Sequence, residues 1–226
     1  GHSIHDVWIE DGIAYSSNWA DGVVAVDIGA KKHKEADRSK SQFNPLLAKA
    51  GQGSPSNPIK LAEMKDPTGR NHAAFPYTSE STGQFYIVGG DENFPWGVMA
   101  TKNKPSNPRG AYHFLNFTDP ENPTEDAIYE VPEAGSHNLW IYGDMLLAGN
   151  YQGGFRVVDI SGELLGDIYK QGREIAHYLS YHEKGRIANA PMVWGAQPYK
   201  DYIFFSDMNS GLYCVQLEEE SSSSTD

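Results

Sequence analysis

Short apolar segments separated by turn residues recur from the beginning of the chain. Residues 7–9, 13–17 and 23–28 are rich in apolar side chains, and Asp11-Gly12 and Asp21-Gly22 stand between them. Apolar runs of this kind, joined by Asp-Gly pairs, predict β-strands connected by tight hairpins. The pattern therefore predicts a meander of antiparallel strands at the start of the chain.

The first meander occurs again later in the sequence. Residues 5–28 (HDVWIEDGIAYSSNWADGVVAVDI) align without a gap with residues 137–160 (HNLWIYGDMLLAGNYQGGFRVVDI), and eight positions are identical. Segments beginning near residues 72 and 191 keep the same order of landmarks. A long repeat without gaps indicates one structural unit that is built several times.

Four landmarks define this repeat. The first strand begins at His5, His72, His137 and, as an exception, Pro191. An aromatic residue follows three positions later, at Trp8, Phe75, Trp140 and Trp194. The second strand ends in a polar residue, at Asn18, Asp91, Asn150 and Asp207. A glycine opens the third strand, at Gly22, Gly110, Gly154 and Gly211. We interpret the aromatic residue as packing between neighbouring units, because aromatic side chains dominate core energetics.

Meanders of four strands that repeat every roughly 50 to 65 residues are typical of β-propeller blades. We therefore predict an all-β propeller of four-stranded antiparallel blades at residues 5–64, 69–131, 135–181 and 190–217. Residues 29–57 form a charged, turn-rich insertion, which we expect to be a solvated loop with a helical turn near residues 44–48. An acidic, Ser-rich tail at 218–226 is predicted to be disordered. Four blades make a small ring, so we expect a fragment of a six- or seven-bladed ring, with missing blades from another chain or a truncated segment.

The segments GVVAVDI (22–28) and GFRVVDIS (154–161), with the turn DPENP (119–123), resemble LVIVD-repeat β-propellers. The resemblance covers residues 5–217 apart from the insertion. It implies a bacterial protein that is secreted or associated with the cell envelope, and it offers no catalytic residue to carry over to this chain.

The formal net charge of −12 argues against binding to nucleic acid or to an anionic membrane surface. No apolar run approaches the roughly 20 residues that cross a bilayer, so membrane insertion is not expected. The single cysteine, Cys214, excludes an internal disulfide and a cysteine-rich metal site, and its apolar neighbours predict a buried thiol. An acidic chain suits a cationic partner or a bound divalent cation.

In a propeller, the first strands line the channel, and the loops before them share a face with the hairpins after the second strands. The histidine and Asn/Asp landmarks are therefore expected to meet at one mouth of the channel. Imidazoles with an open position suit zinc or copper, and carboxylates suit calcium. We predict His5, His72, His137 and Asp91 as metal ligands, with Glu92 as a general base. Alternatively, the same side chains only satisfy backbone groups within their own blades.

Three functions follow from this pattern. The first is a non-enzymatic binding or scaffold module for a protein or glycan partner. Its contact residues are predicted at Asn18, Trp19, Trp96, Asn150, Tyr151, Asp207 and Met208. The alternative is a metal-dependent hydrolase or oxidoreductase with the metal at the channel mouth. The third is a purely structural part of an envelope assembly. No motif of a serine hydrolase or a nucleotide-binding enzyme occurs in the sequence.

Overall fold

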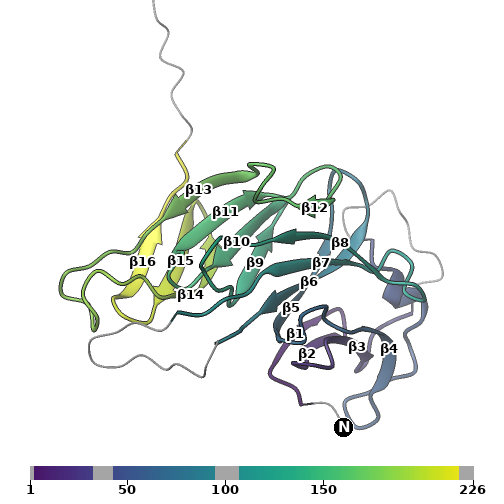
Figure 1. The fold of residues 1–226 in the computed structure, drawn as a ribbon. Helices are drawn as coiled ribbons and strands as arrows, with labels where there is room; N and C mark the ends of the chain where they lie inside the picture. The colour runs from purple at the N-terminus through teal and green to yellow at the C-terminus, as the bar shows by residue number, and fades with distance from the viewer. Residues whose placement is uncertain (1–2, 33–42, 95–106, 219–226) are drawn as a thin grey trace, which may run out of the picture.

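The computed structural model describes residues 3–32, 43–94 and 107–218, and these residues form four β-sheets (Figure 1). Trp96 and the tail at 219–226 lie outside the described residues. Within the described part of the chain, no helix has the length and hydropathy of a membrane span.

Each of the first two sheets is an antiparallel meander in chain order. The first sheet consists of β1 (Asp6–Glu10), β2 (Ile13–Ser17), β3 (Val23–Asp27) and β4 (Ile59–Met64). The second consists of β5 (Asn71–Thr78), β6 (Phe85–Asp91), β7 (Tyr112–Asn116) and β8 (Thr124–Tyr129), with the short β12 (Gly166–Asp167) parallel to β8. Both meanders lie within the predicted blades, and β12 adds a strand from the third unit to the second sheet.

The third and fourth sheets follow the same plan. The third sheet consists of β9 (Leu139–Tyr142), β10 (Met145–Gly149), β11 (Phe155–Asp159) and β13 (Glu174–Tyr178). The fourth has three strands, β14 (Val193–Tyr199), β15 (Tyr202–Asp207) and β16 (Gly211–Val215). Cys214 is exposed on β16, so the expectation of a buried thiol is wrong. The reason is that β16 is the outermost strand of its sheet, and Cys214 lies on the face opposite Tyr213 and Val215, which pack against the core.

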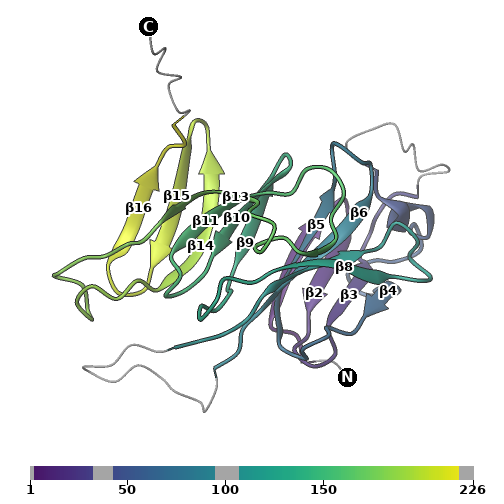
Figure 2. The same cartoon turned by 45° about the horizontal axis from the view of Figure 1, so that its top comes forward.

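The four sheets form a four-bladed β-propeller arrangement, which confirms the predicted fold class. Close contacts between strands join consecutive sheets, because β1 and β2 contact β5, β5 contacts β9, and β9 and β10 contact β14. Both views place the first sheet at one end of the molecule and the fourth at the other (Figures 1 and 2). Whether further blades complete a larger ring stays a prediction.

Aromatic side chains from three first strands join the blades at the axis. The ring of Trp8 lies 4.3 Å from that of Phe75 and 4.9 Å from that of Trp140, measured between centroids. Trp8 packs against the buried clusters on both sides of the second sheet. For these three blades, the predicted packing of the aromatic landmark between units is confirmed.

The described part of the insertion is anchored rather than solvated. Phe43, Leu46 and Ala50 are buried in the core of the first sheet, so the expectation of a solvated loop is wrong there. The predicted helical turn is confirmed as a 3₁₀ helix at Pro45–Ala48, and Asn44 caps it by accepting a hydrogen bond from the N–H of Leu46. Apolar residues spaced along a polar segment gave little periodic signal, which is why the sequence pattern missed this burial.

Candidate metal centre

The first strands of the second and fourth sheets each contain a β-bulge. The register of β5 with β6 shifts between Asn71 and Ala73, and that of β14 with β15 shifts between Val193 and Gly195. His72 and Trp194 are the extra residues at these bulges. A bulge changes the direction in which a side chain points at the edge of a sheet. The structure therefore places Trp194, and not Pro191, at the position of the histidine landmark.

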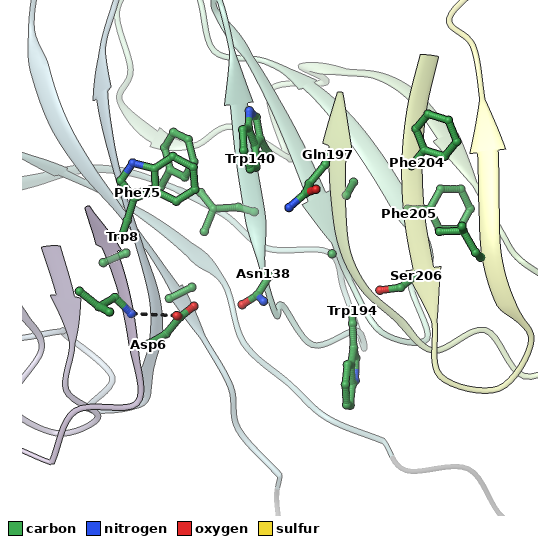
Figure 3. Close-up of a pocket in the computed structure, with 17 residues that line it drawn as sticks. Asp6, Trp8, Phe75, Asn138, Trp140, Trp194, Gln197, Phe204, Phe205 and Ser206 are labelled. Carbon is green, nitrogen blue, oxygen red and sulfur yellow. Dashed lines mark hydrogen bonds between the residues drawn. The ribbon is translucent and has the colours of Figure 1, made fainter. Parts of the chain in front are cut away.

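The next layer of the repeat follows the same register. Trp8, Phe75, Trp140 and Gln197 each pair with the residue three positions before the Asn/Asp landmark of their own sheet. Gln197 thus takes the place that the sequence pattern assigned to Trp194. In Figure 3, Gln197 is drawn near Trp140, while Trp194 lies apart from both, below Asp6 and Asn138.

Four rings form a row across the mouth of the propeller. Ring centroids lie 4.0 Å apart for His5 and His72, 4.2 Å for His72 and His137, and 5.1 Å for His137 and Trp194. His5 Nδ1 lies 3.2 Å from the carbonyl oxygen of His72, and His137 Nδ1 lies 2.9 Å from that of Trp194. A carbonyl oxygen only accepts, so Nδ1 carries a proton in both rings, and Nε2 is the nitrogen available to a ligand in the neutral tautomer. The predicted convergence of the three histidines is present in the structure.

Glu92 supplies the carboxylate of this group. Its Oε2 lies 3.7 Å from His72 Nε2, and its Oε1 lies 3.8 Å from His137 Nε2. These separations are too long for hydrogen bonds. Two ligand atoms about 2.0 Å from one tetrahedral ion lie roughly 3.3 Å apart, so these atoms would have to approach by about 0.5 Å to share an ion. Ligand atoms of His5, His72 and Glu92 all lie within 4.8 Å of one another.

The environment keeps the two inner imidazoles neutral at pH 7. Burial lowers the pKa of His72 to about 3, with further lowering by the neighbouring rings of His137 and His5. Burial also lowers the pKa of His137 to about 4, although the carbonyl of Trp194 acts in the opposite direction. Neutral imidazole is the form that binds a metal ion. His5 is exposed and leaves the group open to solvent.

Asp91 does not join the histidines, which corrects its prediction as a ligand of this centre. Its Oδ2 accepts a hydrogen bond from Thr68 Oγ1 at 2.6 Å and lies 3.0 Å from His113 Nε2. Burial lowers the pKa of His113, but the carboxylates of Asp91 and Glu125 outweigh burial and raise this pKa to about 10. Adjacent residues of a strand point to opposite faces, so Asp91 and Glu92 serve different groups. Glu92, rather than Asp91, is the carboxylate that faces the histidines, and its role as a general base stays a prediction.

Tyr151 orients Glu92, a role that the sequence pattern did not indicate. The buried Tyr151 hydroxyl donates a hydrogen bond to Glu92 Oε1, and its ring packs edge-on against His137 at 5.1 Å. Burial, followed by the Glu92 carboxylate, raises the pKa of Tyr151, so the hydroxyl stays a donor. Tyr151 therefore holds the carboxylate on the side of the two inner histidines.

A cavity of about 440 Å³ begins directly below the row of rings. Asp6, Ala73 and Asn138 line it, and they follow His5, His72 and His137 in sequence. Its walls are mostly apolar, from Trp8, Phe75, Trp140 and Phe205, with polar groups at Asn138, Gln197 and Ser206 (Figure 3). A mostly apolar pocket with a few polar groups is typical of a small-molecule site.

Most of the residues predicted as a partner surface are buried. Asn18, Asn150 and Asp207 are buried, and their side chains bond to backbone groups of their own sheets. Trp19 packs against His5 with centroids 4.6 Å apart, and Tyr151 is buried. Met208 is exposed, and Trp96 lies outside the described residues. Polar side chains at hairpins form hydrogen bonds to the backbone of those turns, so the bonded groups are not available to a partner.

Among known proteins, the chain is similar in fold alone. No protein-family model and no curated protein matches the sequence. The computationally designed protein Ika4 has a similar crystal structure, with a TM-score of 0.54 and 10% identity over 96% of this chain and 92% of Ika4. The designed protein Ika8 matches with a TM-score of 0.53 and 11% identity over 95% of this chain and 46% of Ika8. Identities this low carry the fold and no activity.

Proposed function

We propose that this β-propeller binds a transition-metal ion, zinc or copper, at the mouth of its channel. His5, His72, His137 and Glu92 would be the ligands. The observation that supports this most directly is that His72 and His137, from two blades, lie 3.7 and 3.8 Å from the Glu92 carboxylate, while His5 from a third blade has a ligand atom within 4.8 Å of those of His72 and Glu92. Nitrogen ligands favour zinc or copper over calcium.

The ion would serve a small ligand in the cavity below it. Four protein ligands fill a tetrahedral shell, so water or substrate would bind either by expanding the shell to five ligands or by displacing the exposed His5. A bound water of lowered pKa supports hydrolysis, and a redox-active ion supports oxidation. We therefore favour the metal-dependent hydrolase or oxidoreductase over the binding module, because the predicted partner residues are largely buried. The LVIVD-repeat resemblance, the location at or outside the cell envelope, and a protein or glycan partner stay predictions.

Metal titration of protein made without a polyhistidine tag tests this proposal. After chelation and desalting, we expect one Zn²⁺ or Cu²⁺ per chain by calorimetry and elemental analysis. His72→Ala should weaken binding by roughly 100-fold or more, since a ligand matters more than the outer-shell contacts whose loss costs 10- to 100-fold. Electron paramagnetic resonance of the Cu²⁺ form should show nitrogen ligands that decrease in number in this variant.

A surface histidine provides the matched control. His177 is half exposed and contacts Glu174 at 2.9 Å, outside the ring row. His177→Ala should leave metal affinity unchanged. Binding without a defined stoichiometry, or equal affinity in His72→Ala and His177→Ala, would contradict the proposal.

A further inference from the structure

A second group of polar side chains lies where the first sheet meets the second. Four of its side-chain oxygens are buried and have no hydrogen-bond partner among the described residues. They are Asn18 Oδ1, Asp66 Oδ2, Asn71 Oδ1 and Asp91 Oδ1. Each of these residues is at most 5% exposed. Buried acceptors without a partner cost about 1–3 kcal/mol each, so four on neighbouring segments indicate a missing partner.

Backbone pairing brings these residues together. Trp19, next to Asn18, forms an isolated bridge with Asn71, and its N–H donates to the Asn71 carbonyl at 2.9 Å. Asn71 in turn lies directly opposite Asp91 in the register of β5 and β6. These contacts connect the end of β2 to the end of β6 through a single residue of β5.

Asp66 joins the same group through a hydroxyl and a glycine. Thr68 Oγ1 lies 2.8 Å from Asp66 Oδ1 and 2.6 Å from Asp91 Oδ2. A Cβ on Gly89 would lie 3.0 Å from Asn71 Nδ2 and 3.9 Å from Asp66 Oδ2. The absence of a side chain at Gly89 thus leaves space between the Asn71 amide and the Asp66 carboxylate.

Hydrogen bonds fix both amides with their oxygens unpaired. Asn18 Nδ2 donates to the carbonyls of Ser16 at 2.9 Å and Gly22 at 3.0 Å. Asn71 Nδ2 donates to the carbonyl of Ala73 at 3.0 Å. Turning either amide over would place its oxygen against a carbonyl, so the unpaired atoms are oxygens and not nitrogens.

Acidic side chains outnumber basic ones in this group. His113 lies 3.0 Å from Asp91 Oδ2 with one ring nitrogen and 2.5 Å from Glu125 Oε1 with the other. Ligand atoms of Asp66, Asp91 and His113 all lie within 4.8 Å of one another. Burial, followed by the Asp91 carboxylate, raises the pKa of Asp66.

We propose that Asn18, Asp66, Asn71 and Asp91 bind a hard divalent cation, with calcium preferred to magnesium. The unpaired atoms are all oxygens, which is the ligand type of these cations. Magnesium requires near-ideal octahedral geometry and keeps several waters, whereas calcium accepts irregular sets of protein oxygens. The ion would tie the first blade to the second.

The fourth sheet contains an internal contrast at the same landmark. Asp207 Oδ2 accepts hydrogen bonds from Met192 N at 2.7 Å and Ser180 Oγ at 2.5 Å. Its Oδ1 accepts from the N–H groups of Asn209 and Ser210. Both oxygens of Asp207 are satisfied, so this position needs no ion, unlike Asp91.

Calcium titration of chelator-treated, full-length protein tests the proposal. We expect one Ca²⁺ per chain by calorimetry. A hundredfold excess over Kd should raise Tm by about 5–10 °C, with a smaller shift for Mg²⁺ at the same concentration. Asp66→Asn keeps the shape of the side chain and should weaken calcium binding by roughly 100-fold, again at least as much as an outer-shell change. Asp91→Asn should act in the same direction.

Two control variants separate this site from other effects. Asp207→Asn should lower Tm both with and without calcium and keep the calcium-induced shift. His72→Ala should keep the calcium response while losing the transition metal, so the two sites fail independently. The proposal is overturned if the wild-type protein binds no calcium, or if Asp66→Asn binds it as tightly. The same conclusion follows if the wild-type protein does not respond to calcium and Asp66→Asn is more stable than the wild-type protein. In that case a proton on Asp66, rather than an ion, neutralises the buried carboxylate.

Discussion

At the scale of single residues, the carboxylate of Asp27 accepts five backbone hydrogen bonds from the turn after β3 and from the insertion. Its Oδ1 accepts hydrogen bonds from the N–H groups of Gly29 and Ala30, and its Oδ2 accepts from those of Gly51, Gln52 and Gly53. Burial acts to raise the pKa of Asp27, but these backbone donors hold it well below its usual range. The residue therefore anchors both ends of the described insertion to β3.

We expect Asp27→Asn to lower the free energy of unfolding by about 3 kcal/mol, because an amide cannot accept five N–H donors and loses the charge. The folded-state pKa lies below the unfolded value, so the stabilisation by Asp27 is present above about pH 4 and is lost as the pH falls. Urea unfolding from pH 3 to pH 7 measures this. The variant should be destabilised at pH 7 and should lose less stability than the wild-type protein on acidification.

Asp159 is the matched control because it occupies the same repeat position in the third sheet. In the turn that follows β11, the Asp159 carboxylate accepts a hydrogen bond from one backbone group, the N–H of Ser161. Asp159→Asn should cost about 1 kcal/mol. Equal losses for the two variants would show that the insertion is not anchored through Asp27.

The sequence pattern identified the three histidines, because repeated residues at one strand position must lie at one level of a propeller. It chose Asp91 rather than Glu92 as the carboxylate beside the histidines, but Asp91 faces Thr68 and His113 instead. It also misplaced the fourth unit. His5 and Asn18, His137 and Asn150, and Trp194 and Asp207 are all separated by 13 residues. This constant spacing aligns Trp194 with the histidines, which is the register found in the structure. Matching Trp194 to the other aromatic residues gives a different register.

At the scale of elements, hairpins connect the second and third blades. Asp144, in the β9–β10 hairpin, accepts hydrogen bonds from Tyr77 Oη at 2.5 Å and from the N–H groups of Glu80 and Ser81 at 2.9 and 3.1 Å. These donors belong to β5 and the turn that follows it. The contact lies outside the aromatic cluster and gives the two blades a second, polar connection.

A double-mutant cycle measures this connection. We expect Asp144→Ala to cost about 2–3 kcal/mol, since it removes the acceptor of three hydrogen bonds, and Tyr77→Phe to cost about 1 kcal/mol. The two changes should be less than additive by about 1 kcal/mol, because the second removes a bond already lost in the first. Chemical denaturation of the four proteins gives the coupling energy, and strict additivity would argue against the hydrogen bond.

At the scale of the whole molecule, strand alternation and turn residues sufficed to predict a propeller with four visible blades. The β-bulges of β5 and β14 did not follow from the sequence, because a bulge adds one residue without changing the apolar pattern enough to reveal it. Neither did β12, since Gly166–Asp167 pairs with β8 of another unit through a long-range contact. Local patterns specify blades, whereas contacts between blades decide which side chains meet.

Trp8 is the residue through which these contacts act on the whole molecule, because its ring touches aromatic rings of two other blades. We expect Trp8→Ala to lower the free energy of unfolding by about 3 kcal/mol, at the low end for tryptophan truncation because the side chain is half-buried. At about 2–4 °C per kcal/mol for a chain of this size, Tm should fall by about 6–12 °C. Trp194→Ala removes the same volume from a ring that is 41% exposed and stacks on His137, and should cost about 1 kcal/mol. Calorimetric scans of both variants without added metal separate packing between blades from effects at the histidines. If the losses are equal, the blades are held together by their hairpins and backbone rather than by the aromatic cluster at the axis.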